Sequence, residues 1–310
     1  MSAATSEARS VADVATGPAV GRAALALGVF DGVHRGHRAL LSATREAAAA
    51  RGARPVALVF DPPPVEVIRP GFRLARLAPL DENIAAVAGS GVQPVAVRFD
   101  EAVRELAAED FLAALQPAVE PVAVVMTPFT AFGHERAGTP ERLARIAARR
   151  GFQVVVIDPE TDDGPISSSR IRRALADGEP GLAARLLGRR PAVSGTVVHG
   201  DGRGRELGYP TANLGFAYHP ALPALGIYAG YLDGRPALVS IGRRPQFHEA
   251  GEVVVEAHVL DWEGDLYGHQ VRLELGHRLR DEQRFASVGA LVAQMQRDEE
   301  AARRAFGGLV

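Results

Sequence analysis

Five short apolar runs, separated by stretches with helical patterning, constrain the fold of the first 188 residues more than any other feature. The runs are LALGVF (25–30), PVALVF (55–60), PVAVRF (94–99), PVAVVM (121–126) and FQVVVI (152–157). The stretches at 38–51, 81–90, 101–115 and 139–150 are rich in alanine, arginine and leucine. Continuous apolar strands separated by helices are typical of a parallel sheet covered on both faces. The sequence therefore predicts an α/β domain that binds ligands at the carboxyl ends of its strands.

The patterning changes after residue 188. Beyond a helical stretch at 170–188, short segments alternate apolar and polar residues, at 194–198, 226–232, 235–241, 252–260 and 270–276. Asp233-Gly234 favours a tight hairpin between two of them, and a helical stretch at 286–306 follows. We expect an antiparallel, barrel-like second domain. The predicted organisation is a flexible tail over 1–20, a first domain over 21–188 and a second over 189–310.

Composition restricts the function classes. The chain has no cysteine, which excludes disulfides and cysteine nucleophiles. It has no lysine, which excludes a Walker A loop. The formal net charge of −2 predicts no nucleic-acid partner, and no apolar run reaches the roughly 18 residues of a membrane span. Because the first residues lack the pattern of a secretory signal, we expect a cytoplasmic protein. The sequence leaves homo-oligomerisation open.

The segment GVFDGVHRGH (28–37) follows the first apolar run and opens a helical stretch. A helix that begins after a parallel strand presents backbone N–H groups to an anion. Gly32 permits a tight turn, Gly36 lets a phosphate approach the backbone, and His34 and His37 share one helix face. We predict that the two imidazoles donate hydrogen bonds as charge develops on a phosphate. The predicted site residues are Gly28, Phe30, Asp31, Gly32, His34, Gly36 and His37.

A second segment, ISSSRIR (166–172), also precedes a helical stretch. Serines at the start of a helix are commonly caps. With Arg170 behind them they also form an anion site suited to the outer phosphates of a nucleotide. The predicted nucleotide-binding residues here are Ser167, Ser168 and Arg170.

The second domain has its own candidate site in SGTVVHGDGRGRELGYPTAN (194–213). Backbone N–H groups of a glycine-rich loop cradle phosphates, and the predicted residues are Gly204, Arg205, Gly208 and Pro210. Thr211 and Asn213 offer the hard oxygens that Mg²⁺ prefers. Glu256 lies in an alternating strand, and we expect it on the inward face, where its carboxylate would act as general base toward a hydroxyl.

The early HxGH and late SSSR motifs resemble those of the nucleotidylyltransferase superfamily. Residues 22–306 as a whole resemble the bifunctional bacterial riboflavin kinase/FAD synthetase family. The kinase half carries this resemblance through GRELGYPTAN (204–213), SIGRRPQF (240–247), LDWEGDLYG (260–268) and RDEQRFASVGALVAQMQRD (280–298). The resemblance implies an α/β nucleotidylyltransferase-like Rossmann domain with a parallel sheet, followed by an antiparallel β-barrel riboflavin kinase domain with a C-terminal helix.

The same resemblance implies an activity for each half. The barrel would phosphorylate riboflavin to FMN with ATP, and the α/β domain would adenylylate FMN to FAD. Thr211 and Asn213 would hold Mg²⁺ with ATP, and Glu256 would be the base for the ribityl 5′-hydroxyl. The implied flavin-binding residues are Arg280, Glu282, Arg284 and Phe129.

The α/β half departs from the family pattern at three places. Pro63, in FDPPP (60–64), replaces a histidine that the resemblance places against the triphosphate. MTPFTAFG (126–133) lacks a glycine and a polar residue of the family's segment, and Asn83 stands where lysine is frequent. These changes leave open a riboflavin kinase whose α/β domain is weak, silent or repurposed for another nucleotide or acceptor. A third reading is a flavin- or nucleotide-binding regulator without chemistry, which would need no base such as Glu256.

Overall fold

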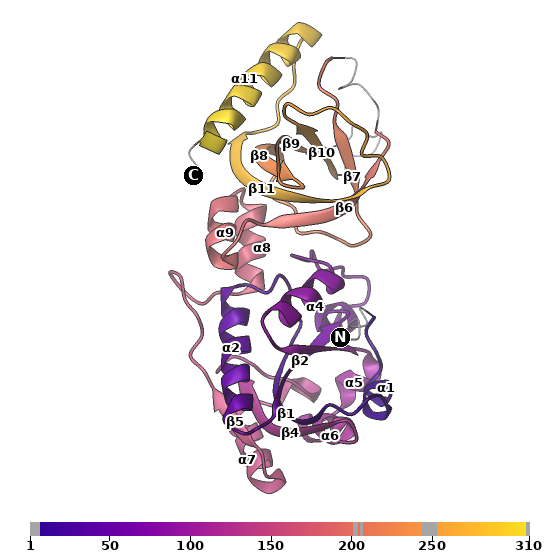
Figure 1. Ribbon diagram of the computed structural model, residues 1–310, viewed down its shortest axis with the longest axis vertical. Coiled ribbons are helices and arrows are strands. Elements are labelled where there is room, and N and C mark those ends of the chain that lie inside the picture. The colour runs from indigo at the N-terminus through magenta and orange to yellow at the C-terminus, as the bar shows by residue number, and fades with distance from the viewer. Residues whose placement is uncertain (1–6, 201–203, 205–206, 244–252, 308–310) are drawn as a thin grey trace. The chain divides into compact units, whose positions relative to one another are not determined.

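A computed structural model describes residues 7–200, 204, 207–243 and 253–307, and their contacts divide the chain into two units (Figure 1). The first unit comprises Met1–Leu74 and Pro79–Ser167, and the second comprises Ala75–Ala78 and Ser168–Val310. In the part of the chain that the structure describes, no helix combines the length and the hydropathy needed to cross a membrane.

A five-stranded parallel sheet forms the centre of the first unit, as predicted, with the order β3-β2-β1-β4-β5. Its strands are β1 (Gly21–Gly28), β2 (Arg54–Asp61), β3 (Gln93–Arg98), β4 (Val119–Met126) and β5 (Gln153–Val156). The helices are α2 (Arg35–Ala49), α3 (Pro64–Ile68), α4 (Leu80–Gly89), α5 (Glu101–Glu105), α6 (Ala108–Leu115) and α7 (Pro140–Arg150), with a 3₁₀ turn at His134–Arg136. Ala23, Ala24, Leu25 and Ala26 are all fully buried. Both faces of β1 are therefore covered, which explains its continuous apolar sequence.

The strand order places a topological switch point between β1 and β4, because β2 and β3 lie on one side of β1 and β4 and β5 on the other. Loops that follow strands on the two sides of such a point leave the sheet in different directions and open a crevice between them. The loop after β1 carries the HxGH motif, and the loop after β4 carries residues 127–133. The fold therefore brings two of the predicted segments to one edge of the sheet.

One prediction about local structure in this unit is wrong. Residues 1–20 were expected to be a flexible tail, but Val11–Thr16 forms helix α1, and Val14 is buried in the core. Arg9 pairs with the sheet edge, since its N–H donates to the Ala96 carbonyl and its carbonyl accepts from the Arg98 N–H. The stretch with helical patterning at 101–115 contains both α5 and α6, which are separated at Leu106, where the backbone is extended.

The second unit begins with two helices, α8 (Ser168–Ala176) and α9 (Pro180–Leu187). The single helix predicted at 170–188 is wrong, since Gly178 adopts a φ of +76° between the two and Pro180 opens α9. A closed barrel follows, with the order β10-β7-β6-β11-β8-β9. Its elements are β6 (Ala192–Val198), β7 (Ala212–Gly215), β8 (Gly226–Leu232), β9 (Arg235–Arg243), β10 (Val253–Val259), β11 (Gln270–Arg280) and the final helix α11 (Val288–Gly307).

The predicted antiparallel barrel with a C-terminal helix is therefore confirmed. The interior is filled by alternate residues of the strands, such as Val255, Ala257 and Val259 of β10. The contacts assign α8 and α9 to the barrel unit, and the carbonyl of Leu175 in α8 accepts from the N–H of Ala224. The boundary expected at 188/189 stays a prediction.

Candidate active sites

The loop between β1 and α2 is a tight turn with unusual backbone geometry. Phe30, Gly32 and Val33 have φ angles of +52°, +77° and +36°, and non-glycine residues adopt such values only when their surroundings fix them. One fixing contact is a buried hydrogen bond of 2.9 Å from the Gly32 N–H to the side-chain oxygen of Asn83 in α4. Sequence reasoning did not assign Asn83 to the site. The detectable signal was a polar amide within the apolar face of a helix.

The two histidines lie at the start of α2 and touch each other. His34 is the N-cap, and its Nδ1 accepts a hydrogen bond of 3.2 Å from the backbone N–H of His37. The two rings stack with centroids 3.7 Å apart. Among the described residues, Nδ1 of His37 is buried without a hydrogen-bond partner. Burial, together with the neighbouring His34, lowers the pKa of His37 well below its ordinary value. Burial therefore favours the neutral imidazole of His37, which can donate a hydrogen bond but carries no charge.

Gly36 is closely packed on two sides. A Cβ there would lie 3.2 Å from the His34 ring and 3.3 Å from the carbonyl oxygen of Ile166. The loop that leads to the serine motif therefore packs against the start of α2. Ser167 ends the first unit, whereas Ser168 and Arg170 belong to α8 of the second. That these serines share a phosphate site with the histidines stays a prediction.

A largely apolar cavity of about 600 Å³ opens at the same edge of the sheet. Its lining comes from the end of β1, from β2 and α3, and from residues 129–136. Phe129, the predicted flavin-binding residue, is 67% exposed and lines this cavity. Both altered segments of the sequence contribute to the region. Pro64 lines the cavity, Pro63 precedes α3 as a buried N-cap residue, and Met126 is buried at the end of β4.

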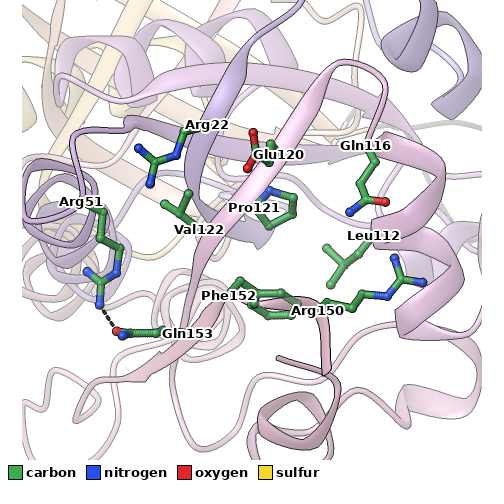
Figure 2. A pocket seen from close by; sticks show the side chains of 11 residues that line it. Arg22, Arg51, Leu112, Gln116, Glu120, Pro121, Val122, Arg150, Phe152 and Gln153 are labelled. Atoms are coloured by element: carbon green, nitrogen blue, oxygen red, sulfur yellow. Dashed lines mark hydrogen bonds between the residues drawn. The ribbon is translucent and has the colours of Figure 1, made fainter. Parts of the chain in front are cut away.

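A second pocket of this unit, of about 350 Å³, lies at the opposite edge, where the strands begin (Figure 2). It is rich in arginine, but two of its arginines already have partners. Arg51 donates to the side chain of Gln153, and Arg150 donates to Glu109 at 3.0 Å. None of the predicted site residues lines it.

In the barrel unit, a glycine turn shapes the segment that ends in PTAN (210–213). The Gly204 carbonyl accepts from the N–H groups of Leu207 and Tyr209, at 3.1 and 2.8 Å. A Cβ on Gly204 would lie 2.3 Å from the Tyr209 carbonyl oxygen, so only glycine fits. Gly208 adopts a φ of +82°. Arg205 lies outside the described residues.

A cavity of about 500 Å³ collects most of the predicted nucleotide and metal residues of the barrel. Its lining includes the segment 262–267 together with Gly208, Pro210, Thr211 and Asn213. Asn213 is 6% exposed, and its Oδ1 has no hydrogen-bond partner among the described residues. An unpartnered buried oxygen favours an additional ligand. Thr211 and Asn213 therefore fit a hard cation held together with phosphate oxygens.

Glu256 lies on β10 directly opposite Asn213 of β7 and Ser240 of β9. Residues opposite one another in antiparallel strands share a face, so the three side chains lie together. The inward orientation expected for Glu256 is wrong, because its neighbours Val255 and Ala257 fill the barrel interior and alternation sends Glu256 to the outer face. His258 has the same parity, and its Nδ1 lies 2.8 Å from the Pro210 carbonyl oxygen.

The residues predicted to bind flavin in the second unit lie at the end of β11 and directly after it. The guanidinium of Arg280 makes three contacts of 2.6 to 3.0 Å with the carboxylate of Asp298 in α11. Arg280 therefore joins β11 to the C-terminal helix. The carboxylate of Glu282 lies against Gly242 of β9, and Arg284 is exposed. Their contact with flavin stays a prediction.

An α/β unit with a histidine-capped helix at its switch point, together with a barrel whose cavity contains the PTAN segment, is the arrangement expected of a two-domain nucleotide-dependent transferase. Comparisons with known proteins agree. The family model described as FAD synthetase matches residues 18–170, and the one described as riboflavin kinase matches residues 187–306.

Curated relatives match nearly the whole chain. The bifunctional riboflavin kinase/FMN adenylyltransferase of Escherichia coli K12 is 38% identical over 296 residues, which cover 91% of this chain and 92% of that protein. The Bacillus subtilis protein of the same description is 30% identical, with 93% and 94% covered. A crystal structure described as a macrolide-efflux protein from Streptococcus pneumoniae superimposes with a TM-score of 0.83 at 30% identity, covering 91% of this chain and 94% of that one.

The chain therefore belongs to the bifunctional riboflavin kinase/FMN adenylyltransferase family. It is an enzyme with an N-terminal FAD synthetase domain and a C-terminal riboflavin kinase domain, which confirms the predicted order and both predicted activities.

Proposed function

We propose that each reaction takes place at the site described in its unit. The barrel phosphorylates riboflavin at the cavity beside Thr211 and Asn213, and the first unit adenylylates FMN at the carboxyl edge of its sheet. The observation that carries the kinase assignment is the buried, unpartnered Oδ1 of Asn213 in a cavity that the PTAN segment lines. Both reactions use ATP, and we place them in the cytoplasm.

In the kinase reaction, Thr211 and Asn213 would hold Mg²⁺ together with ATP. The ion, when bound, neutralises charge on the phosphate oxygens. Glu256, on the same face of the strands as Asn213, accepts the proton of the ribityl 5′-hydroxyl. The hydroxyl oxygen then bonds to the γ-phosphorus of ATP, and the bond from that phosphorus to the β,γ-bridging oxygen breaks to release ADP.

In the adenylylation, a phosphate oxygen of FMN bonds to the α-phosphorus of ATP, and pyrophosphate leaves. The protein supplies position and hydrogen bonds rather than a covalent intermediate. Because Nδ1 of His34 accepts from His37, a neutral His34 carries its proton on Nε2 and can donate there. The 600 Å³ apolar cavity beside this site accommodates a flavin ring.

The altered segments predict an imbalance between the two reactions. Pro63 has neither a side-chain donor nor a backbone N–H, and losing one donor to a developing phosphate charge costs about 10²–10³ in rate. We expect FMN to accumulate before FAD when riboflavin and Mg-ATP are supplied and products are resolved over time. Pro63→His should raise the rate of FAD formation and leave FMN formation unchanged. FAD formation from FMN as fast as FMN formation would contradict the imbalance.

The same time course tests the nucleotide choice and the alternatives. Transfer that is supported by CTP and not by ATP would show that the first unit uses another nucleotide. FMN without FAD at any time would contradict the adenylylation site proposed here, and no product of either kind would contradict both sites.

A further inference from the structure

We propose that Arg35, the second residue of the HRGH segment (34–37), is a positioning residue for adenylyl transfer. It would hold the loop that carries the serine motif against the start of the histidine helix. The inference rests on the adenylylation site proposed above and adds to it a residue with no part in the predicted site.

Arg35 contacts two carboxylates that lie more than 120 residues further along the chain. Its Nη2 donates to Oε1 of Glu160 at 2.7 Å, and its Nη1 donates to Oδ2 of Asp162 at 2.9 Å. Hydrogen bonding to Glu160, followed by that to Asp162, raises the pKa of Arg35 above its ordinary value. The arginine side chain is 32% exposed and that of Asp162 is 19% exposed, so both are partly shielded from solvent.

The loop that these contacts hold is closed on itself. The N–H of Ile166 donates to the carbonyl of Glu160, and the N–H of Asp162 donates to the carbonyl of Gly164. Thr161 and Pro165 form a β-bridge across it. Because the two ends of the loop are joined, fixing Glu160 and Asp162 also fixes Ile166 and the adjoining Ser167.

The packing at Gly36 is a second, independent observation that the loop carrying the serine motif lies against the start of α2. A Cβ at position 36 would lie 3.3 Å from the carbonyl oxygen of Ile166 and 3.2 Å from the His34 ring, which is a tight contact on both sides. The backbone of the loop that carries the serine motif and the ring of the capping histidine therefore meet at Gly36, and Arg35 is the residue directly before it. An ion pair alone on this surface would contribute little to stability, but here it sets the distance between the start of α2 and the loop that ends at Ser167.

The chemical consequence concerns ATP rather than FMN. The serine motif is predicted to hold the outer phosphates of the nucleotide, and a displacement of about 1 Å can cost about 10² in rate. Loss of the Arg35 contacts should therefore raise KM for ATP and lower kcat for FAD formation, with little effect on KM for FMN. Kinase activity in the same chain should be unchanged.

The test is a mutant cycle on the full-length protein, with FAD formation and FMN formation both measured. Arg35→Gln should lower kcat/KM for ATP in FAD formation by about 10–100-fold. The double variant Glu160→Gln/Asp162→Asn should lower it similarly, and the triple variant should be no worse than Arg35→Gln, because all of them break one contact. Arg35→Lys, which keeps the charge and lacks the planar fork, should fall between wild type and Arg35→Gln. Arg45→Gln, on the same helix, is the control and should change neither activity.

A direct contact of Arg35 with a phosphate would give a different result. Removing Glu160 and Asp162 would then leave FAD formation unchanged or faster, and the effects in the triple variant would not merge; either outcome overturns the positioning role. Unchanged FAD formation in Arg35→Gln would also overturn it. A wild type that forms FMN and no FAD would instead contradict the adenylylation site on which the inference rests.

Discussion

The ion pair between Arg280 and Asp298 predicts how strongly the C-terminal helix is attached to the barrel. The two side chains are 16% and 6% exposed, and Gln294 donates a further hydrogen bond of 2.7 Å to Asp298. Asp298→Asn keeps the shape of the side chain and leaves the Arg280 guanidinium without its counter-charge. Breaking one partner of a buried pair costs about 3–5 kcal/mol. With a urea dependence of about 2 kcal/mol per molar, the unfolding midpoint of the barrel should fall by about 2 M.

The single tryptophan of the chain allows this measurement on one unit. Trp262 lies in the barrel unit and packs against its core, so its fluorescence follows barrel unfolding in the full-length protein. Glu300→Gln is the matched control on the same helix. Glu300 pairs with Arg304 at 3.9 Å, both side chains are more than 70% exposed, and the expected change is below about 0.5 kcal/mol. Equal midpoints for the two variants would refute the role assigned to the Arg280 pair.

Three further predictions concern the two sites and the boundary between the units. Glu256→Gln should lower the rate of FMN formation by about 10²–10⁴ while riboflavin binding, measured by flavin fluorescence, persists; near-full turnover would exclude Glu256 as the base. Folded His37 stays neutral below pH 6.5, whereas in the unfolded chain it gains a proton near that pH. The free energy of unfolding therefore decreases as the pH falls below about 6.5, by at most about 1.4 kcal/mol per pH unit. Urea unfolding followed by circular dichroism should show a smaller loss for His37→Gln, and equal losses would contradict the buried neutral state. A fragment of residues 168–310 should phosphorylate riboflavin and have a higher urea midpoint than a fragment of 189–310, because Leu186 and Leu187 of α9 are buried; equal midpoints would favour the boundary at 188/189.

The sequence predicted the strands well because their burial leaves a direct trace. Residues of a strand covered on both faces are all apolar, and residues of a barrel strand alternate. The strand predicted at 226–232 coincides with β8. Strand β7 was not predicted, because it has only four residues and follows a Pro-Thr turn. Helix α1 was not predicted either, since its six residues bury a single valine and give too short a pattern.

The residue types of the motifs predicted which residues form the sites. They did not predict which distant side chains hold those residues in place. The sequence indicated which histidines, serines and glycines belong to a phosphate site, but the carboxylates that fix Arg35 and Arg280 lie 125 and 18 residues further on. Nothing in the local pattern distinguishes an arginine held by carboxylates from one that faces a ligand. Alternation along a strand divides its residues between two faces, but it does not tell which face fills the barrel. The face on which Glu256 lies was therefore not decided by the sequence alone.

The structure gives a physical reason for Asn83, which departs from the family pattern. The resemblance gives lysine as the frequent residue at this position, and a lysine ammonium has three donors and no acceptor. The amide of Asn83 accepts from the Gly32 N–H at 2.9 Å and is buried, a contact that a lysine ammonium has no lone pair to make. In this lysine-free chain the turn between β1 and α2 is therefore held by a neutral amide. Burial also lowers the pKa of His37 well below its ordinary value, which favours a neutral imidazole beside the same turn.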